Sequence, residues 1–330
     1  MCAAARSEML DDPRARRSCP HMAFALETNL RHASGHPLAD RRYDYAMASR
    51  QDGDHVACAD LLEQALELAP QWAAGWFALG ESREATGDHE QAAIAFGRAL
   101  DLVPADDLGA GLRLARLRGA TPSTAPADYV RALFDQYAPK FDEHLVGALD
   151  YRAPGLLRDA LRETCGHDAR FAHALDLGCG TGLAAVALRD CVEQFSGVDL
   201  SPAMVEKARQ TRLYESLRAG DLVEFLSRQP DATANLVIAA DVFVYMGDLG
   251  EAFRQSSRAL GPGGVFCFTM QAADAGDFML GEDLRFAHSE IYIRDLARAQ
   301  DLGVKVLRPQ STRKDRGHDV PGFLVVLAKP

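Results

Sequence analysis

The chain has 330 residues, a formal net charge of −11 and 48% hydrophobic residues. This length suits two domains, and the hydrophobic content suits packed cores. The acidic excess argues against a protein that binds nucleic acid or an anionic membrane over a large surface, and no apolar stretch is long enough to span a bilayer.

The seven cysteines are odd in number and contain no Cys-x-x-Cys pair. This distribution predicts reduced thiols, with neither a disulfide framework nor a zinc site. The first residues also lack the apolar core of a secretion signal, so we expect a cytoplasmic protein. No cluster of His, Asp and Glu residues has metal-binding spacing, and we therefore expect chemistry without a metal.

Residues 1–38 lack hydrophobic periodicity and are expected to form a disordered or loosely ordered arm. A repeat follows in residues 39–119: GDH at 53–55 returns at 87–89, and ALELAP at 65–70 returns as ALDLVP, both after 34 residues. This period resembles the tetratricopeptide repeat, a helix–turn–helix unit. We expect a small all-α domain of two such repeats, closed by a capping helix.

Residues 120–128 are rich in Pro, Ser and Thr and predict a linker. In residues 129–330, short apolar runs typical of strands alternate with helical stretches. This alternation predicts a mostly parallel sheet with helices on both faces. Only a polar loop separates the last two runs, VKVLR and FLVVLAK, so we expect the final strand to be antiparallel.

The stretch ALDLGCGTGL, residues 174–183, joins a predicted strand to a predicted helix, which is where open α/β sheets bind ligands. A dinucleotide would favour the spacing G-x-G-x-x-G, and Asp176 would repel its pyrophosphate. A carboxylate here favours a cationic ligand instead, and S-adenosylmethionine carries both a sulfonium and an ammonium group. The loop residues expected to touch it are Gly178, Cys179, Gly180, Thr181 and Gly182.

Acidic residues also follow the next two predicted strands. Asp199, in GVDLSPAMVEKAR, lies 23 residues after Asp176, where an acid binds the two hydroxyls of a ribose. Met204 begins the next helix and is expected to pack on the adenine, while Asp221 accepts from the adenine amino group. The neighbouring Leu200 and Leu222 complete this side of the predicted cofactor site.

With these motifs, residues 129–330 resemble a class I S-adenosylmethionine-dependent methyltransferase of the small-molecule type related to quinone-biosynthesis methyltransferases. The matching stretches are ALDLGCGTG, GVDLSPAMVEKAR, GDL, LVIAADVFVYMGDL and ALGPGGVFCFT. The whole chain resembles bacterial methyltransferases that begin with tetratricopeptide repeats. The resemblance implies a Rossmann-like α/β fold with a seven-stranded, mostly parallel sheet whose last strand is antiparallel, and methyl transfer from S-adenosylmethionine.

Aromatic residues are expected to line the acceptor side of the cleft. Asp241 ends the fourth predicted strand and should face the cofactor, and Phe243 and Tyr245 either wall the pocket or pack in the core. In the helical stretch after residue 128, Tyr137 shares a face with Phe134 and Phe141. This face either packs on its neighbours or forms a lid that excludes water from the cofactor.

A base is needed only when the acceptor must lose a proton. His144 and His288 are the candidates because histidine titrates near neutrality, with a surface or capping role as the alternative for each.

Three functions remain open at this point. The first is methyl transfer to a small molecule with an oxygen, nitrogen or carbon nucleophile, and it implies a covered, apolar pocket. The second is a protein methyltransferase whose repeats recruit the client, and it implies an open groove between the domains. The third is a non-catalytic scaffold that binds the cofactor. We rank them in this order and expect neither nucleic acid nor membrane as a partner.

Overall fold

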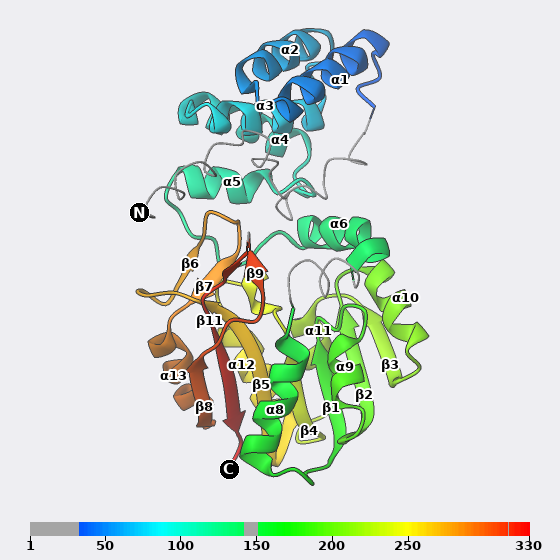
Figure 1. Cartoon of the computed structure of the whole chain (residues 1–330), viewed down its shortest axis with the longest axis vertical. Helices are drawn as coiled ribbons and strands as arrows, with labels where there is room; N and C mark the ends of the chain where they lie inside the picture. The colour runs from blue at the N-terminus through cyan, green and yellow to red at the C-terminus, as the bar shows by residue number, and fades with distance from the viewer. Residues whose placement is uncertain (1–32, 142–150, 316) are drawn as a thin grey trace, which may run out of the picture.

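The computed structural model describes residues 33–141, 151–315 and 317–330. The chain forms an all-α part and an α/β part, with α6 between them (Figure 1). Within the described ranges, no helix combines the length and the apolar composition needed to cross a bilayer.

The all-α part consists of two helical hairpins and a fifth helix. Its helices are α1 (Pro37–Gln51), α2 (His55–Leu68), α3 (Ala73–Ala85), α4 (His89–Leu102) and α5 (Ala110–Leu117). The second helix of each hairpin begins with the same cap, because the side chains of Asp54 and Asp88 accept hydrogen bonds from the backbone N–H groups of Ala57 and Gln91. The 34-residue repeat of the sequence is thus a structural repeat of matched helix starts.

Charged contacts join α5 to both parts of the molecule. The guanidinium of Arg113 contacts Glu81 and Glu84 of α3 at 2.6 and 2.8 Å. One turn further along α5, the side chain of Arg116 donates to the carbonyl oxygen of Glu282, 2.7 Å away in the α/β part. Helix α5 therefore closes the helical array and touches the loop between β6 and β7.

The α/β part is built on a nine-stranded sheet, with seven strands in the order β3-β2-β1-β4-β5-β11-β8 and a hairpin of β6 and β7 beside β5. Strands β1 to β5 are parallel along this path, and β11 is antiparallel to both β5 and β8. Strands β9 and β10 form a separate pair. The bounds are β1 (Phe171–Leu177), β2 (Val192–Asp199), β3 (Tyr214–Ala219), β4 (Ala234–Ala239), β5 (Leu260–Ala272), β6 (Phe278–Leu280), β7 (Phe286–His288), β8 (Gly303–Pro309), β9 (Lys314–Asp315), β10 (His318–Asp319) and β11 (Gly322–Ala328).

Helices cover both faces of this sheet, whereas α6 lies between it and the all-α part (Figure 1). The helices of the α/β part and this connection are α6 (Ala127–Tyr137), η2 (Ala138–Lys140), α8 (Ala153–Cys165), α9 (Leu183–Leu188), α10 (Pro202–Gln210), α11 (Leu222–Ser227), η3 (Phe243–Tyr245), α12 (Gly250–Ala259) and α13 (Glu290–Ala299). Along β4, Leu236 and Ile238 pack with α8 and α9, whereas Val237 packs with α11, α12 and α13. This alternation follows from the two-residue period of a strand, and the central strands are apolar on both faces because both faces are buried.

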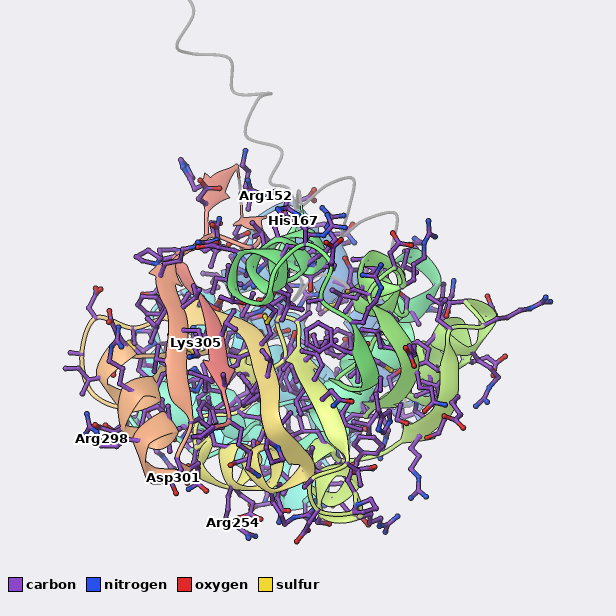
Figure 2. The ribbon with its side chains drawn as sticks, turned by 90° about the horizontal axis from the view of Figure 1, so that it is seen from below. Arg152, His167, Arg254, Arg298, Asp301 and Lys305 are labelled. Carbon is purple, nitrogen blue, oxygen red and sulfur yellow. The ribbon has the colours of Figure 1, made fainter. Side chains whose placement is uncertain are left out.

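Charged side chains lie on the outside of these layers. Arg254 of α12 and Arg298 of α13 point away from the sheet at the rim of the molecule (Figure 2). Their ion pairs with Glu251 and Asp295 are exposed and contribute little to stability.

Residues 123–126, which we call the strap, fasten the segment between the two parts onto the α/β part. The carbonyl of Ser123 accepts hydrogen bonds from the N–H groups of Gly247 and Asp248 at 2.8 Å, and the N–H of Ala125 donates to the carbonyl of Tyr245 at 3.0 Å. The segment predicted as a linker is therefore docked at its centre, and α6 begins inside the predicted range, at Ala127.

Two further expectations differ from the structure. The sheet was expected to have seven strands and has nine among the described residues, because the β6–β7 hairpin extends it beside β5. Of the predicted arm, residues 1–32 lie outside the described ranges, and helix α1 already begins at Pro37. The nature of the repeats stays a prediction.

Candidate active site

The glycine turn after β1 approaches the segment after β4 very closely. Gly178 has a backbone φ of +61°, and a Cβ atom there would lie 2.6 Å from Cγ2 of Val242. Two positions later, a Cβ on Gly180 would meet no atom of the described residues nearer than the ring of Phe141, at 4.0 Å. The turn thus needs glycine at Gly178 for packing, and at Gly180 its backbone lines a cavity.

The carboxylate of Asp199, at the end of β2, is held by the same turn. It accepts hydrogen bonds from the N–H groups of Gly180 and Ser201, both at 2.9 Å. Loss of contact with water raises the pKa of Asp199 to about 6, although the two N–H groups act in the opposite direction. Each oxygen keeps a second lone pair that can accept from a ligand hydroxyl.

Asp176, near the end of β1, is buried beneath the turn. Its carboxylate accepts a hydrogen bond of 2.6 Å from the hydroxyl of Tyr214. Burial raises the pKa of Asp176 to about 7, and the negative charge of Asp199 adds to the shift. Two carboxylates with raised pKa values under one loop favour a ligand that brings positive charge.

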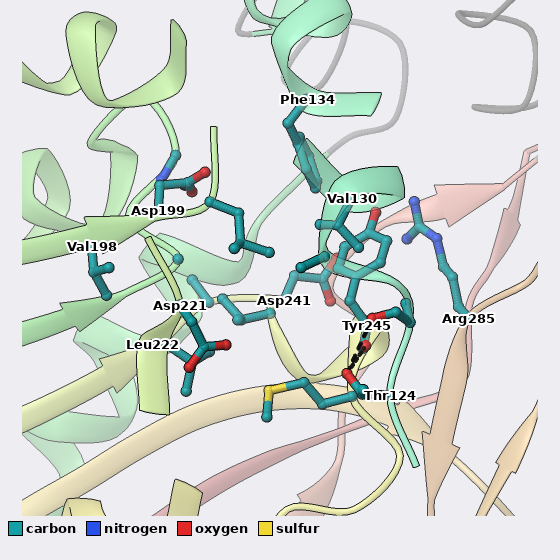
Figure 3. Close-up of a pocket in the computed structure, with 18 of the residues that line it drawn as sticks. Thr124, Val130, Phe134, Val198, Asp199, Asp221, Leu222, Asp241, Tyr245 and Arg285 are labelled. Carbon is teal, nitrogen blue, oxygen red and sulfur yellow. Dashed lines mark hydrogen bonds between the residues drawn. The ribbon is translucent and has the colours of Figure 1, made fainter. Parts of the chain in front are cut away.

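A cavity of about 370 Å³ lies outside the carboxyl ends of the central strands. Its walls come from the turns after β1, β2, β3 and β4, from the strap and from α6 (Figure 3). Strands β1 and β4 are neighbours at its base, where the chain switches from one half of the sheet to the other, and ligands bind at such switch points. A second cavity of about 40 Å³ adjoins it under the turn and is lined by Asp176.

Asp241 stands in the middle of the main cavity wall with an unusual backbone φ of +62°. Its carboxylate makes an ion pair of 2.6 Å with Arg313, and the hydroxyl of Thr312 lies 3.3 Å away. Both charged side chains are largely buried. The charge of Asp241 is therefore neutralised within the protein.

The end of the cavity farthest from Asp199 is formed by Arg285 and Tyr245 (Figure 3). The guanidinium carbon of Arg285 lies 5.7 Å from the centre of the Tyr245 ring, which is a cation–π distance. Val130 and Phe134 of α6 line the cavity next to them and are apolar. One end of the cavity is thus acidic, and the other is basic with apolar neighbours.

The structure brings most of the predicted cofactor residues to these two cavities. Those in the wall of the main cavity are Gly178, Gly180, Asp199, Leu200, Asp221, Leu222 and Asp241. Cys179 and Thr181 join Asp176 in the smaller one. Asp221 also caps α11, since one of its oxygens accepts from the N–H groups of Val223 and Glu224.

Four of the predicted cofactor residues lie outside both cavities. Gly182 packs against Tyr214 and Thr211, and Met204 is fully buried in α10. Phe243 is fully buried against Phe266 and Phe268, so core packing is its role. Tyr137 is buried with its ring against Phe141.

His288, the candidate base that the structure describes, does not line the cavity. His288 is fully buried in β7, and its Nε2 lies 2.9 and 3.0 Å from the carbonyl oxygens of Met246 and Gly247. Burial lowers the pKa of His288 to about 4, so it is neutral at pH 7 and donates from Nε2. The expectation of a base at His288 is corrected to a structural role, and His144 lies outside the described residues.

Sequence reasoning missed Arg285, Arg313, Tyr214 and the strap. None of them belongs to a motif, and each reaches the site from a distant part of the chain.

Among the residues that the structure describes, no group of three or more His, Cys, Asp or Glu side chains could hold a metal ion.

This fold and this site define a Rossmann-like protein that binds its ligand across the switch point of a mostly parallel sheet. Residues 175–268 match the family model described as "Methyltransferase domain". Human methyltransferase-like protein 27 is 34% identical over 137 residues, which are 41% of this chain and 55% of that protein. Malonyl-[acyl-carrier protein] O-methyltransferase of Serratia marcescens is 32% identical over 99 residues, 30% of this chain and 38% of that protein.

The chain thus spans about half, or less, of the length of these curated relatives. Among solved structures, the [4+2]-cyclase SpnF matches with a TM-score of 0.50 at 20% identity, over 64% of this chain and 98% of that chain, and this likeness shows the fold. The family match and the named relatives agree that residues 175–268 lie in a methyltransferase domain.

Proposed function

We propose that this protein transfers a methyl group from S-adenosylmethionine to a small-molecule acceptor with an oxygen, nitrogen or carbon nucleophile. The observation that carries this proposal is that the cavity of about 370 Å³ joins Asp199 and the glycine turn to an end with apolar side chains that the strap and α6 cover. A covered cavity of this size suits a small molecule better than the side chain of a folded protein client.

The residues present fit the cofactor, because the open backbone at Gly180 and the two buried acids suit a cationic nucleoside. In this proposal the free lone pairs of Asp199 accept from the ribose hydroxyls. Asp221 and Leu222 hold the adenine, and Asp176 sets the negative potential beneath the amino acid portion. When bound, the cofactor supplies an electrophilic methyl group on its sulfonium.

The chain's own contribution is alignment and the exclusion of water. Phe134 and the strap cover the cavity and keep bulk water from the acceptor. We propose that no metal takes part. Since His288 is neutral and outside the cavity, the proposal gives it no proton to move.

We further propose that α1 to α4 are two tetratricopeptide repeats and that residues 129–330 form the catalytic domain. Such helical arrays present recognition surfaces, so a protein partner at this part of the molecule is compatible with a small-molecule acceptor.

The test has two stages. Titration calorimetry of the full chain with S-adenosylmethionine and with NADH is expected to give micromolar binding for the first and none for the second. Formation of S-adenosylhomocysteine is then measured with the low-molecular-mass and the protein fractions of a bacterial extract. Turnover with the small molecules supports the proposal, turnover only with proteins would replace it by a protein methyltransferase, and binding without turnover on either fraction favours a scaffold.

A further inference from the structure

A tyrosine of β3 reaches across β2 to the buried acid of β1. The hydroxyl of Tyr214, the first residue of β3, donates a hydrogen bond of 2.6 Å to the carboxylate of Asp176. Strand β2 lies between the two, and there Gly197 is the direct neighbour of Asp176. A Cβ atom on Gly197 would lie 2.8 Å from Cε1 of Tyr214, so only a residue without a side chain leaves room for the ring to cross β2.

The third glycine of the turn holds the same ring from another side. A Cβ atom on Gly182 would lie 3.3 Å from Cε2 of Tyr214 and 3.5 Å from its hydroxyl oxygen. The ring of Phe195 packs on Tyr214 as well, with 5.8 Å between the ring centres. The two glycines and this phenylalanine therefore fix the Tyr214 ring, and its hydroxyl stays at the carboxylate. Gly182, which lies outside both cavities, thus has a place in the same site.

The hydroxyl of Tyr214 holds Asp176 without cancelling its charge. Burial and the charge of Asp176 raise the pKa of Tyr214 well above its usual value, so the hydroxyl is neutral and donates. A neutral donor favours the ionised carboxylate and leaves its negative charge in place. Asp241 shows the contrast, because its carboxylate is paired with the guanidinium of Arg313.

The other titratable groups near Asp176 do not take over this role. The charge of Asp199 on β2 opposes the ionisation of Asp176. Cys179 in the turn and Tyr151 before α8 also interact electrostatically with Asp176, and burial raises the pKa of both, so they are neutral at pH 7. Among the described residues around Asp176, Tyr214 is thus the one that favours its ionised form.

We propose that Tyr214 is a positioning residue for the amino acid portion of the cofactor, because its hydroxyl fixes the carboxylate of Asp176 where an ammonium group can bind. Asp176 lines the smaller cavity, which at about 40 Å³ has room for only part of a ligand. Asp199 serves the ribose in the same site, so the two acids have separate tasks. This inference rests on the proposed function and adds to it a residue that acts through Asp176.

The test compares two ligands that differ in the amino acid portion. S-adenosylhomocysteine and 5′-methylthioadenosine share the adenosine and the thioether sulfur, and the second lacks the amino acid. Titration calorimetry on the full chain measures both ligands with the wild type and with Tyr214→Phe, which keeps the ring between the two glycines and removes the donor. At pH 7 we expect S-adenosylhomocysteine to bind about fivefold more weakly to the variant, and 5′-methylthioadenosine to change by less than about twofold.

The size of the effect follows from the charge of Asp176. Loss of a hydrogen bond to the charged form should raise the pKa of Asp176, which is about 7 in the wild type, by about one. The ionised fraction then falls from about one half to about one tenth at pH 7, and from about nine tenths to about one half at pH 8. The loss of S-adenosylhomocysteine affinity should therefore shrink from about fivefold at pH 7 to about twofold at pH 8.

Two further variants separate positioning from packing. In a chain that already carries Asp176→Asn, adding Tyr214→Phe should weaken S-adenosylhomocysteine by less than about twofold, since the hydroxyl acts through that carboxylate. Tyr292→Phe is the matched control. The hydroxyl of Tyr292 also donates to a carboxylate, that of Asp248 at 3.1 Å, but outside the cofactor site, and its loss should leave the affinity for both ligands as in the wild type.

Equal losses for both ligands, an equal loss at pH 7 and pH 8, or no loss at all would overturn the role of Tyr214 while the proposed function stands. A further loss of the same size when Tyr214→Phe is added to Asp176→Asn would overturn it too. The comparison at two pH values decides the question even where Asp176→Asn is unstable. If the wild type binds neither ligand, the proposed function fails, and this inference fails with it.

Discussion

Replacing Asp199 by asparagine tests the cofactor end of the cavity most directly. The two carboxylate oxygens each accept a backbone N–H at 2.9 Å, from Gly180 and from Ser201. An asparagine can accept with one oxygen only, so its NH₂ group would face one of these donors and could not accept from a ribose hydroxyl. Loss of a hydrogen bond to a charged group costs about 1.5–3 kcal/mol, or roughly 10- to 150-fold in the dissociation constant.

Titration calorimetry with S-adenosylmethionine at pH 8 measures this loss, because Asp199 is then ionised in the wild type. Glu193→Gln is the matched control: Glu193 lies on the same strand, β2, but is exposed and should bind as the wild type does. If Asp199→Asn keeps the wild-type dissociation constant within twofold while remaining folded, Asp199 does not contact the cofactor and the assignment of this end is wrong.

The other predictions concern pH, packing and the strap. Asp176 and Asp199 have pKa values of about 7 and 6, above the ordinary 3.8, so their contribution to the stability of the free protein is complete below about pH 4 and is lost as the pH rises to about 7. Since a cationic cofactor prefers the ionised carboxylates, its affinity should rise from pH 5 to 8. A flat calorimetric profile over this range would contradict the prediction. Gly178→Ala should lower the melting temperature and weaken cofactor binding through roughly 1–2 kcal/mol of backbone strain plus a clash, whereas Gly155→Ala, whose Cβ meets nothing within 4 Å, should not. A chain starting at residue 120 keeps the strap and should bind cofactor like the full chain, whereas one starting at 129 should lose affinity for any ligand of the far end; equal binding by both would remove the strap from the site.

The residues that sequence reasoning placed well are those whose position the local chain determines. A strand end followed by glycines fixes where Gly178 and Asp199 stand, because both follow adjacent parallel strands and so reach the same edge of the sheet. Met204 shows the limit of this reasoning. The pattern indicated a helix at the right place, but which face of α10 meets the cavity depends on how the helix packs, and Met204 is fully buried in α10, outside the cavity.

Apart from Tyr245 and Phe134, the far end could not be predicted in this way. Arg285 and Tyr245 are 40 residues apart, and the strap lies more than 100 residues before either of them. Only the packing of three distant segments brings them together, and no local spacing records it. The prediction of His288 as a base failed for the same reason, because its ring is held by the carbonyl groups of Met246 and Gly247, about 40 residues earlier in the chain.

The strap affects how a ligand leaves the cavity. Its three backbone hydrogen bonds to Tyr245, Gly247 and Asp248 seal one wall of the cavity, and the chain continues from it on one side into α5 and on the other into α6. An acceptor that leaves on this side must open those bonds or displace α6, and both movements are slower than diffusion from an open groove. The turnover rate would then depend on how often this wall opens. A protein partner bound to α5 would change that rate through the contact of Arg116 with Glu282.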